Sequence, residues 1–379
     1  MNLEPPIPAD VLAAVRAPFA AAQAQAIDPP VIQPLGLLLD LAGEAMHARL
    51  FIVQGLGGEE ACLRPDFTMA VARSHIAAGA AAGRYVYEGK AFRVSTPEAG
   101  HPEEFLQIGL EAFGGADAAL ADAEAAGLAW RAALAGGRGD LTLSMGDVGL
   151  YHAFIAALGL APSLTQRLAR AFSRPRAMGA ELDSFQTADA APRQGDRIAG
   201  LLSGLPEAEA AKALEDLWAL AGIAPVGGRS AAEIAQRLAQ RAEAARAPRL
   251  TAAQADLVRR YLEIRGAPQP AVEAVAALAK AGGLELDGAL DAWSQRLSAL
   301  AAGGVDLSRA TLATAFGRDF GYYDGFLFEV RSAALDATSP VAAGGRYDGL
   351  LARLGGTGAG AAVGCMVRPG RAWAAGACA

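Results

Sequence analysis

The stretch that decides the fold reads YVYEGKAFRV at residues 85–94 and, after a polar loop, EFLQIGLEAFG at residues 104–114. Both pieces have the length and the alternation of β-strands, and the short loop between them predicts that they pair as a hairpin. In the second strand, apolar residues at even positions alternate with polar or small ones. Because successive side chains of a strand point to opposite faces, one face of this strand carries Gln107, Gly109 and Glu111.

The first strand of the hairpin repeats this pattern. One of its faces carries Tyr87, Gly89, Ala91 and Arg93. Small residues flanked by an amide, a carboxylate and a guanidinium leave room above the sheet and offer a few oriented polar groups, as a pocket for a polar small molecule requires. A solvated sheet face is the commoner explanation for one such strand. Two paired strands with the same pattern favour the pocket.

Composition and length exclude several classes of protein. The chain has 379 residues, enough for one large core and a smaller second unit. Its apolar runs are too short to span a membrane, and its first residues lack the pattern of a signal peptide. Three cysteines and four scattered histidines show no spacing typical of disulfide frameworks or metal sites. We therefore expect a cytoplasmic protein with no metal and no cofactor.

The charge of the chain gives little reason to expect a nucleic-acid partner. The net charge is −7, so the whole molecule has no basic footprint. Arginines do gather between residues 237 and 265, but glutamates and aspartates are interleaved with them, which is typical of a solvated helix surface. Binding of tRNA by this segment is unlikely on these grounds.

The pattern of the chain changes twice. Residues 186–304 are rich in alanine and in helical spacing, and they contain no residues that suggest chemistry. Strand-like patterns return after residue 305, with segments such as FLFEV and AAVGCMV. We therefore predict a core formed by residues 1–185 and 305–379, interrupted by a helical insertion at residues 186–304.

Several blocks of sequence resemble a known family. CLRPDFTMAVAR at residues 62–73, the hairpin, and AAGGRYDGLLARLGG at residues 342–356 resemble the catalytic domain of histidyl-tRNA synthetase, a class II aminoacyl-tRNA synthetase. GRDFGYYDGFLFE at residues 317–329 resembles the histidine-specific segment of that family. The resemblance implies an α+β fold, with a class II synthetase-like antiparallel sheet flanked by helices. It predicts a fold, and not by itself an activity.

A weaker match concerns self-association. VIQPLGLLLD at residues 31–40 is similar to the first, dimer-forming motif of the family, with Pro34 in the place of the motif's proline. The resemblance therefore implies a homodimer with Pro34 and its neighbours at the interface.

The resemblance implies that the amino-acid half of a synthetase site is kept. Asp66 stands where the family has a glutamate that faces the amino group of histidine, and Arg318 has the spacing of a histidine-specific arginine. For each residue alone, ordinary packing is the alternative, or a surface charge for Glu111. The histidine-like pocket implied by the resemblance comprises Asp66, Thr68, Gln107, Glu111, Arg318, Tyr323 and Tyr347.

The nucleotide half departs from the family. Arg93 falls on the motif 2 arginine, which holds the α-phosphate, and Arg371 on the motif 3 arginine, so these two form a vestigial nucleotide site. However, Ser95 replaces a glutamate, and Glu103 replaces an arginine. An anion in place of a cation repels a triphosphate. Pro369, which precedes Arg371, is tolerated only in the first turn of a helix, so either the motif 3 helix begins late or Arg371 sits elsewhere. The family's C-terminal anticodon-binding domain is also expected to be absent.

This combination resembles the regulatory subunits of ATP phosphoribosyltransferase, the first enzyme of histidine biosynthesis. The resemblance implies a chain without catalytic residues that dimerises within a larger hetero-oligomer, activates a short catalytic subunit, and takes part in feedback inhibition by L-histidine. Histidine binding in the pocket and at a subunit interface stay open as alternatives. Two other functions also stay open: a genuine histidyl-tRNA synthetase or tRNA-independent histidine-activating ligase, and a free-standing histidine sensor.

Overall fold

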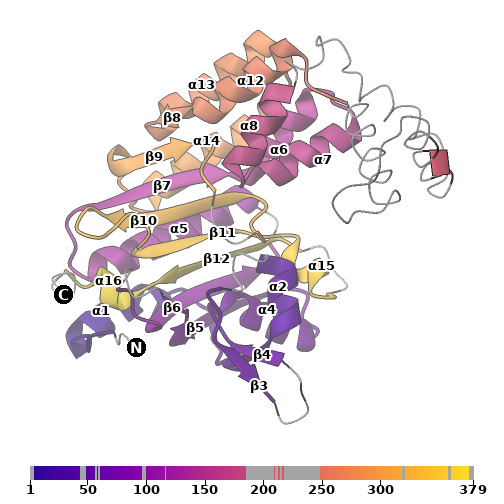
Figure 1. The fold of residues 1–379 in the computed structure, drawn as a ribbon. Helices are drawn as coiled ribbons and strands as arrows, with labels where there is room; N and C mark the ends of the chain where they lie inside the picture. Colours follow the sequence, from indigo (N-terminus) through magenta and orange to yellow (C-terminus); the bar gives the residue numbers. More distant parts are fainter. Residues whose placement is uncertain are drawn as a thin grey trace. The chain divides into compact units, whose positions relative to one another are not determined.

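The structure, a computed structural model, describes residues 4–42, 48–55, 58, 60–95, 100–115, 117–184, 209, 212–213, 216, 248–317, 321–356 and 360–374. The chain divides into two compact units (Figure 1), of which the first comprises Met1–Ala157 with Arg260–Ala379 and the second Leu158–Arg259. Within the described residues, no helix combines the length and the apolar character that crossing a bilayer requires.

The first unit is built on a large mixed sheet. Nine strands of the described residues follow the order β1-β5-β6-β12-β11-β10-β7-β9-β8. Neighbours from β5 to β7 are antiparallel, whereas β1 with β5 and β7 with β9 are parallel. The strands are β1 Gln25–Ala26, β5 Gly83–Phe92, β6 Glu104–Phe113, β7 Leu141–Asp147, β8 Arg265–Gly266, β9 Ala310–Ala313, β10 Phe326–Ser332, β11 Ala342–Arg346 and β12 Ala362–Val367.

The predicted hairpin is confirmed as β5 and β6. Its register places Tyr85 opposite Glu111 and Gly89 opposite Gln107. A smaller antiparallel sheet has the order β2-β4-β3, with β2 Ile32–Pro34, β3 Ile52–Gln54 and β4 Glu60–Leu63. The α+β class and the class II synthetase-like sheet expected from the sequence are thus present.

One long helix, α5 (Ala118–Ala135), covers one face of the large sheet. It packs against β7, β10, β11 and β12, and α1 (Ala9–Ala20) and α14 (Asp287–Ala302) pack against it in turn. Its many alanines allow this close approach, and Asp117 caps its start by accepting a hydrogen bond from the backbone of Leu120. The other helices of the unit are α2 Leu35–Ala42, α4 Thr68–Ala77, α6 Val148–Ala157, α13 Pro268–Gly282, α15 Leu350–Arg353 and α16 Pro369–Ala372, with a short 3₁₀ helix at Leu307–Arg309.

A buried ion network ties these layers together. Asp122 of α5 is fully buried and accepts hydrogen bonds from Arg296 of α14 at 2.7 and 3.1 Å and from Arg346 of β11 at 2.9 Å. Arg296 also lies 3.5 Å from Asp147 at the end of β7. Burial raises the pKa of Asp122, and the two guanidinium groups oppose that rise. Removal of one partner of this network would leave a buried charge uncompensated and would destabilise the folded chain.

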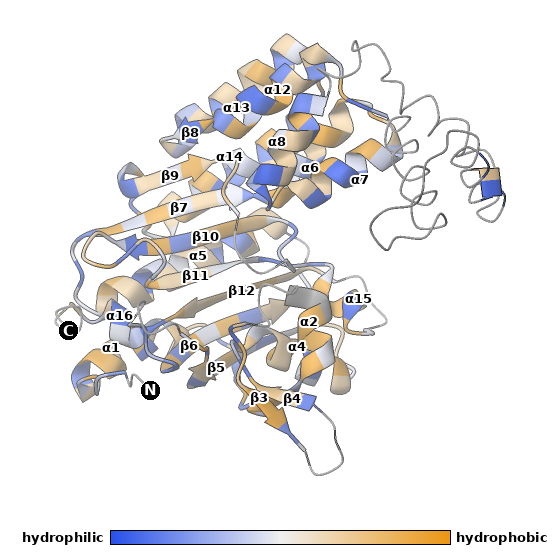
Figure 2. Cartoon of the chain, viewed as in Figure 1, coloured by the Kyte–Doolittle hydropathy of each residue, from blue (hydrophilic) through white to orange (hydrophobic). Residues whose placement is uncertain are grey.

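The described part of the second unit is helical, with α7 (Pro162–Ala171) and α8 (Pro175–Asp183) joined by an ion pair at 3.0 Å between Arg167 and Glu181. Most of helix α12 (Ala252–Glu263) also belongs to this unit; it begins directly after Thr251, and Thr251 and Gln254 form reciprocal cap hydrogen bonds. Figure 2 shows hydrophilic and hydrophobic residues side by side on α12, as expected for a two-sided helix.

The division into units differs from the predicted insertion. Most of residues 186–247 lie outside the described residues, and α13 and α14, which lie in the predicted insertion, belong to the first unit. The bounds of the core at 1–185 and 305–379 and of the insertion at 186–304 stay a prediction.

Candidate functional site

The candidate site lies on the sheet face opposite α5. Leu110 of β6 and Val363 of β12 line a small cavity together with Leu128 of α5. One residue further along these strands, Glu111 and Gly364 line a different pocket. Because neighbouring residues of a strand point to opposite faces, this pocket is on the face that α5 leaves open.

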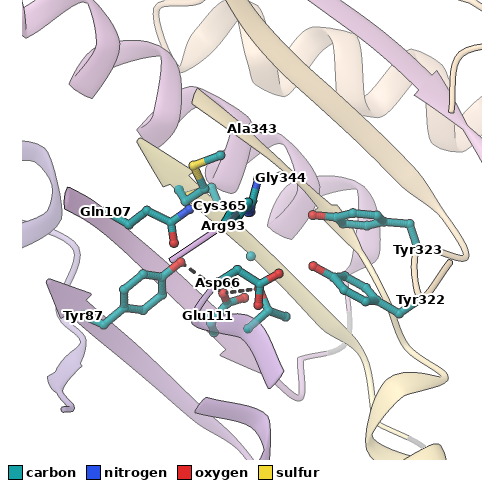
Figure 3. A pocket seen from close by; sticks show the side chains of 13 residues that line it. Asp66, Tyr87, Arg93, Gln107, Glu111, Tyr322, Tyr323, Ala343, Gly344 and Cys365 are labelled. Carbon is teal, nitrogen blue, oxygen red and sulfur yellow. Dashed lines mark hydrogen bonds between the residues drawn. The ribbon is translucent and has the colours of Figure 1, made fainter. Parts of the chain in front are cut away.

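The pocket gathers residues from six segments of the chain. Figure 3 shows Tyr87 and Gln107 on one side and the hydroxyl groups of Tyr322 and Tyr323 directed inward from the other. In this structure the cavity of the pocket is small, with a volume of about 20 Å³, which suits one water molecule. The full lining consists of Asp66, Thr68, Tyr87, Arg93, Gln107, Glu111, Tyr322, Tyr323, Ala343, Gly344, Gly364, Cys365 and Met366.

Glu111 is the central acid of the pocket and is only 1% exposed. Thr68, the first residue of α4, donates a hydrogen bond of 2.8 Å from its hydroxyl to Oε1, and Tyr87 donates one of 3.3 Å to the same oxygen. Tyr347 donates to Oε2. Burial raises the pKa of Glu111 to about 8, against the effect of these hydrogen bonds. The group therefore titrates near neutral pH.

A glycine on the neighbouring strand makes room for this carboxylate. A Cβ atom at Gly364 of β12 would lie 1.6 Å from Oε2 of Glu111. Any side chain at that position would displace Glu111 from its hydrogen-bond partners. The small residues that the sequence places on this face thus have a direct steric role.

Gln107 is buried without hydrogen-bond partners. Its side chain is 0% exposed, and neither Oε1 nor Nε2 has a hydrogen bond within the described residues. A buried amide in this state costs free energy, and such groups usually indicate a missing water or ligand. Since Gln107 lines the pocket, a polar ligand there would satisfy it.

Hydrogen bonds hold the segment that carries Tyr322 and Tyr323 in place. Asp324, just after Tyr322 and Tyr323, accepts hydrogen bonds of 2.9 and 2.7 Å from the backbone amides of Asp348 and Gly349. This joins the two family-like segments at 317–329 and 342–356. The ring of Tyr347 lies 5.7 Å from that of Tyr322, centroid to centroid.

The structure brings five of the seven predicted histidine-pocket residues to the pocket lining: Asp66, Thr68, Gln107, Glu111 and Tyr323. Tyr347 is buried behind Glu111, so it positions the acid and does not line the pocket. Arg318 lies outside the described residues. The contacts of these residues with histidine stay a prediction.

Sequence reasoning missed Tyr322 and Cys365 as lining residues, and gave Tyr87 no role beyond its place on the face. The alternation of the hairpin was the signal for Tyr87. Nothing in the sequence placed Cys365 of β12 next to β6, because that pairing joins residues far apart in the chain.

A second and larger cavity continues along the same sheet face. It has a volume of about 480 Å³ and shares Arg93 and Met366 with the first pocket. Arg371 lines it as well, so both residues of the predicted vestigial nucleotide site meet there. Of the two alternatives that Pro369 left open, the structure shows the late start: the helix that carries Arg371 begins at Pro369.

Two positions that depart from the family pattern lie beside this cavity. The backbone amide of Ser95 is 3.4 Å from Oε1 of Glu103, and the amide of Arg93 donates a hydrogen bond of 2.8 Å to the backbone oxygen of Glu103. Glu103, just before β6, thus contacts the backbone of Arg93 and Ser95, which directly follows β5. Among the described residues, no three His, Cys, Asp or Glu side chains are grouped so that they could hold a metal ion.

The chain is similar to known proteins along most of its length. The profile of the histidyl-tRNA synthetase family matches residues 13–246 and 213–369. The ATP phosphoribosyltransferase regulatory subunit of Brucella anthropi is 35% identical over 350 residues, which cover 91% of each chain. The protein of the same name from Agrobacterium fabrum is 38% identical over 342 residues, or 89% of each chain.

The chain belongs to the ATP phosphoribosyltransferase regulatory subunit family. Solved structures agree on the fold. A protein from Bacillus halodurans C, described as an ATP phosphoribosyltransferase regulatory subunit/histidyl-tRNA synthetase, has a TM-score of 0.63 at 18% identity, covering 96% of this chain and 77% of that one. The histidyl-tRNA synthetase of Nostoc sp. PCC 7120 has a TM-score of 0.58 at 14% identity, covering 95% of this chain and 69% of that one.

Proposed function

We propose that this chain is a non-catalytic subunit that binds the short catalytic subunit of ATP phosphoribosyltransferase, activates it, and takes part in its inhibition by histidine. The observation that carries the proposal is the similarity to regulatory subunits along about 90% of the chain. The site geometry supports it. A polar pocket whose residues match the family's amino-acid site lies next to a second cavity, and Glu103, in the loop beside that cavity, stands where the family has an arginine.

Activation of the partner is tested by mixing. The full chain and the short catalytic chain are each purified, and turnover of ATP and phosphoribosyl pyrophosphate is measured for the catalytic chain alone and after mixing. We expect co-elution on a sizing column and a clear rise in turnover. Turnover that is the same with and without this chain, at micromolar concentrations of both, contradicts the proposal.

The absence of synthetase chemistry is tested on the chain by itself. Histidine-dependent exchange between pyrophosphate and ATP reports formation of an aminoacyl adenylate. We expect no exchange above background, because Ser95 and Glu103 remove the family's charges next to the nucleotide. A genuine histidyl-tRNA synthetase, assayed in parallel, serves as the positive control. Robust exchange by this chain means that it is an enzyme and the regulatory assignment is wrong.

We also propose that histidine binds in the pocket around Glu111. The support is the unsatisfied amide of Gln107 together with the acids Asp66 and Glu111, which suit an amino group and an imidazole. The cavity of about 20 Å³ is smaller than histidine, so binding must move part of the lining outward.

Calorimetry tests this pocket. Gln107→Leu and Tyr323→Phe should each weaken histidine binding about tenfold, the effect of losing one good hydrogen bond to a buried ligand. Gln269→Leu, an exposed amide on α13, is the matched control. Equal histidine affinity in both pocket variants and the control places histidine elsewhere, such as at a subunit interface.

Self-association is the last part of the proposal. On the small sheet β2-β4-β3, Ile32, which is 56% exposed, and the exposed Pro34 lie on the same face of β2. Exposed apolar residues on one face of a sheet are typical of a protein interface. We propose that this surface joins two copies of the chain.

A further inference from the structure

The two faces of strand β2 have different surroundings. Ile32 and Pro34 are exposed on the surface proposed above for self-association, whereas Gln33 between them is only 3% exposed. Oε1 of Gln33 accepts a hydrogen bond of 2.8 Å from Arg73 of α4, and Nε2 donates one of 2.6 Å to the backbone oxygen of Pro30. The inward face of β2 is thus bonded to α4.

Helix α4 connects this strand to the pocket. Its first residue, Thr68, lines the pocket and donates the hydrogen bond of 2.8 Å to Oε1 of Glu111. Arg73 follows on the same helix and holds Gln33. Because a helix is a rigid element, a displacement of Thr68 is passed on to Arg73 and from there to β2. This is one route between the pocket and the exposed face of β2.

A stack of three planar groups makes a second route. Tyr87 lines the pocket and donates a hydrogen bond of 3.3 Å to Glu111. Its ring lies 4.3 Å from the ring of Phe67, centroid to centroid, with an angle of 6° between the two planes. The guanidinium carbon of Arg64 lies 3.9 Å from the centroid of the Phe67 ring. Stacking of this kind fixes the rings and the cation relative to one another.

Arg64 also holds the stretch of chain that enters β2. Its side chain is buried and donates a hydrogen bond of 2.6 Å to the backbone oxygen of Pro29, and its backbone amide donates one of 2.8 Å to the oxygen of Val31. Gly89 leaves the space for this arrangement, because a Cβ atom there would lie 2.7 Å from Nη2 of Arg64. Both routes from the pocket therefore end at β2.

Entry of a ligand must move this scaffold. The cavity of about 20 Å³ is smaller than histidine, and Thr68 and Tyr87 are both part of its lining. A close-packed interior has little free volume, so it transmits such a displacement. A ligand that displaces either residue acts on α4 or on the stack, and through them on the strand that presents Ile32 and Pro34.

We propose that histidine binding in the pocket and self-association through β2 are linked, and that Arg73 and Arg64 carry the linkage. This inference rests on the proposed function, because it needs both binding events. The linkage is favourable: a ligand that satisfies Gln107 also orders Thr68 and Tyr87, so β2 loses less conformational freedom when two chains associate. Self-association then strengthens histidine binding by the same factor.

The test compares histidine binding by a dimer and by a monomer. Calorimetry on the full chain gives the affinity, and light scattering gives the mass. Ile32→Glu should yield a monomer that binds histidine at least about fivefold more weakly than the wild-type dimer, although Ile32 is not a lining residue of the pocket. Leu120→Glu, at an α5 position that is 54% exposed against 56% for Ile32, is the matched control and should change neither mass nor affinity. Pro34→Glu serves if Ile32→Glu does not fold.

A second pair of variants tests the route. Arg73→Met removes the hydrogen bond to Gln33. Adding Ile32→Glu to this variant should weaken histidine binding by no more than about twofold, because one of the two routes is already cut. In an Arg265→Met background, which removes an exposed arginine on β8, the full fivefold loss should remain.

The outcomes separate this inference from the proposed function. A wild-type chain that is monomeric or binds no histidine overturns both, and so do β2 variants that all stay dimeric. Equal affinity in the wild-type dimer and the Ile32→Glu monomer overturns the linkage alone, as does an undiminished effect in the Arg73→Met background. If Ile32→Glu weakens histidine binding while Gln107→Leu does not, histidine binds at the interface itself and the linkage is wrong.

Discussion

The buried acid Glu111 should make the stability of this chain depend on pH in a specific way. Its pKa in the folded chain is about 8, whereas the ordinary value is 4.5. A carboxyl group with a raised pKa holds its proton in the folded state over a range where the unfolded chain has released it. Folding is therefore favoured by low pH, and this contribution is lost as pH rises from about 4.5 toward 8.

The magnitude follows from the linkage relation. Each pH unit in the window is worth about 1.4 kcal/mol, so raising the pH from about 5.5 to about 7.5 should cost about 2.5 kcal/mol of unfolding free energy through this group alone. Glu111→Gln removes the titration and keeps a side chain of nearly the same shape. The unfolding free energy of the variant minus that of the wild type should therefore rise by about 2.5 kcal/mol between these two pH values.

Urea denaturation followed by circular dichroism at pH 5.5 and pH 7.5 measures this difference for both proteins. All other titrating groups are common to the two proteins and cancel. Glu285→Gln, at an exposed position, reports the effect of removing a negative charge from the surface. A difference between Glu111→Gln and wild type that is the same at both pH values refutes the reasoning, because it means that Glu111 does not hold a proton near neutral pH.

Three further changes test other features. Asp122→Asn should lower the free energy of unfolding, measured with heat or urea, by about 3–5 kcal/mol, because it leaves two buried guanidinium groups short of a partner. Glu124→Gln on the same helix, in an exposed pair, should lower it by only about 0–1 kcal/mol. Equal losses in the two variants would contradict the role of the buried network. Gly364→Ala should destabilise by about 1–3 kcal/mol through its overlap with Glu111, while Gly360→Ala, whose added methyl would make an ordinary contact, should not. Ile32→Glu should convert a dimer into a monomer by light scattering at micromolar concentration, and a monomeric wild-type chain would remove the basis of that prediction.

The hairpin and the face that carries the pocket could be predicted because strand alternation is a local signal. Once β5 and β6 are strands, Gln107 and Glu111 must share a face with Tyr87 across the register. Blocks of family-like sequence then identified the segments at residues 62–73, 317–329 and 342–356 as further parts of the lining, but not β12. The position of Asp66 and Thr68 near Glu111 could be predicted only through that resemblance, since α4 is remote from β6 in the chain.

Other parts of the site depend on strand and helix pairings that no local sequence pattern indicates. The neighbours of β6 in the sheet are β5 and β12, and only the second brings Arg368 beside Phe105. Likewise, an amphipathic helix such as α14 shows that it buries one face but not which helix it packs against. The contact of Arg296 with Asp122 joins residues 174 positions apart, and no spacing in the sequence predicts it.

The order of strands in the large sheet has a consequence for how the protein is made. β10, β11 and β12 fill the space between β6 and β7, although β10 leaves the ribosome about 180 residues after β7. At about 5–20 residues per second, the nascent chain exposes two unpaired strand edges for about 10–35 s. Both cavities can therefore form only after nearly the whole polypeptide has been made. A chain that ends before β10 would keep these strand edges unpaired, and such a fragment would be prone to aggregation unless a chaperone or a protease acted on it.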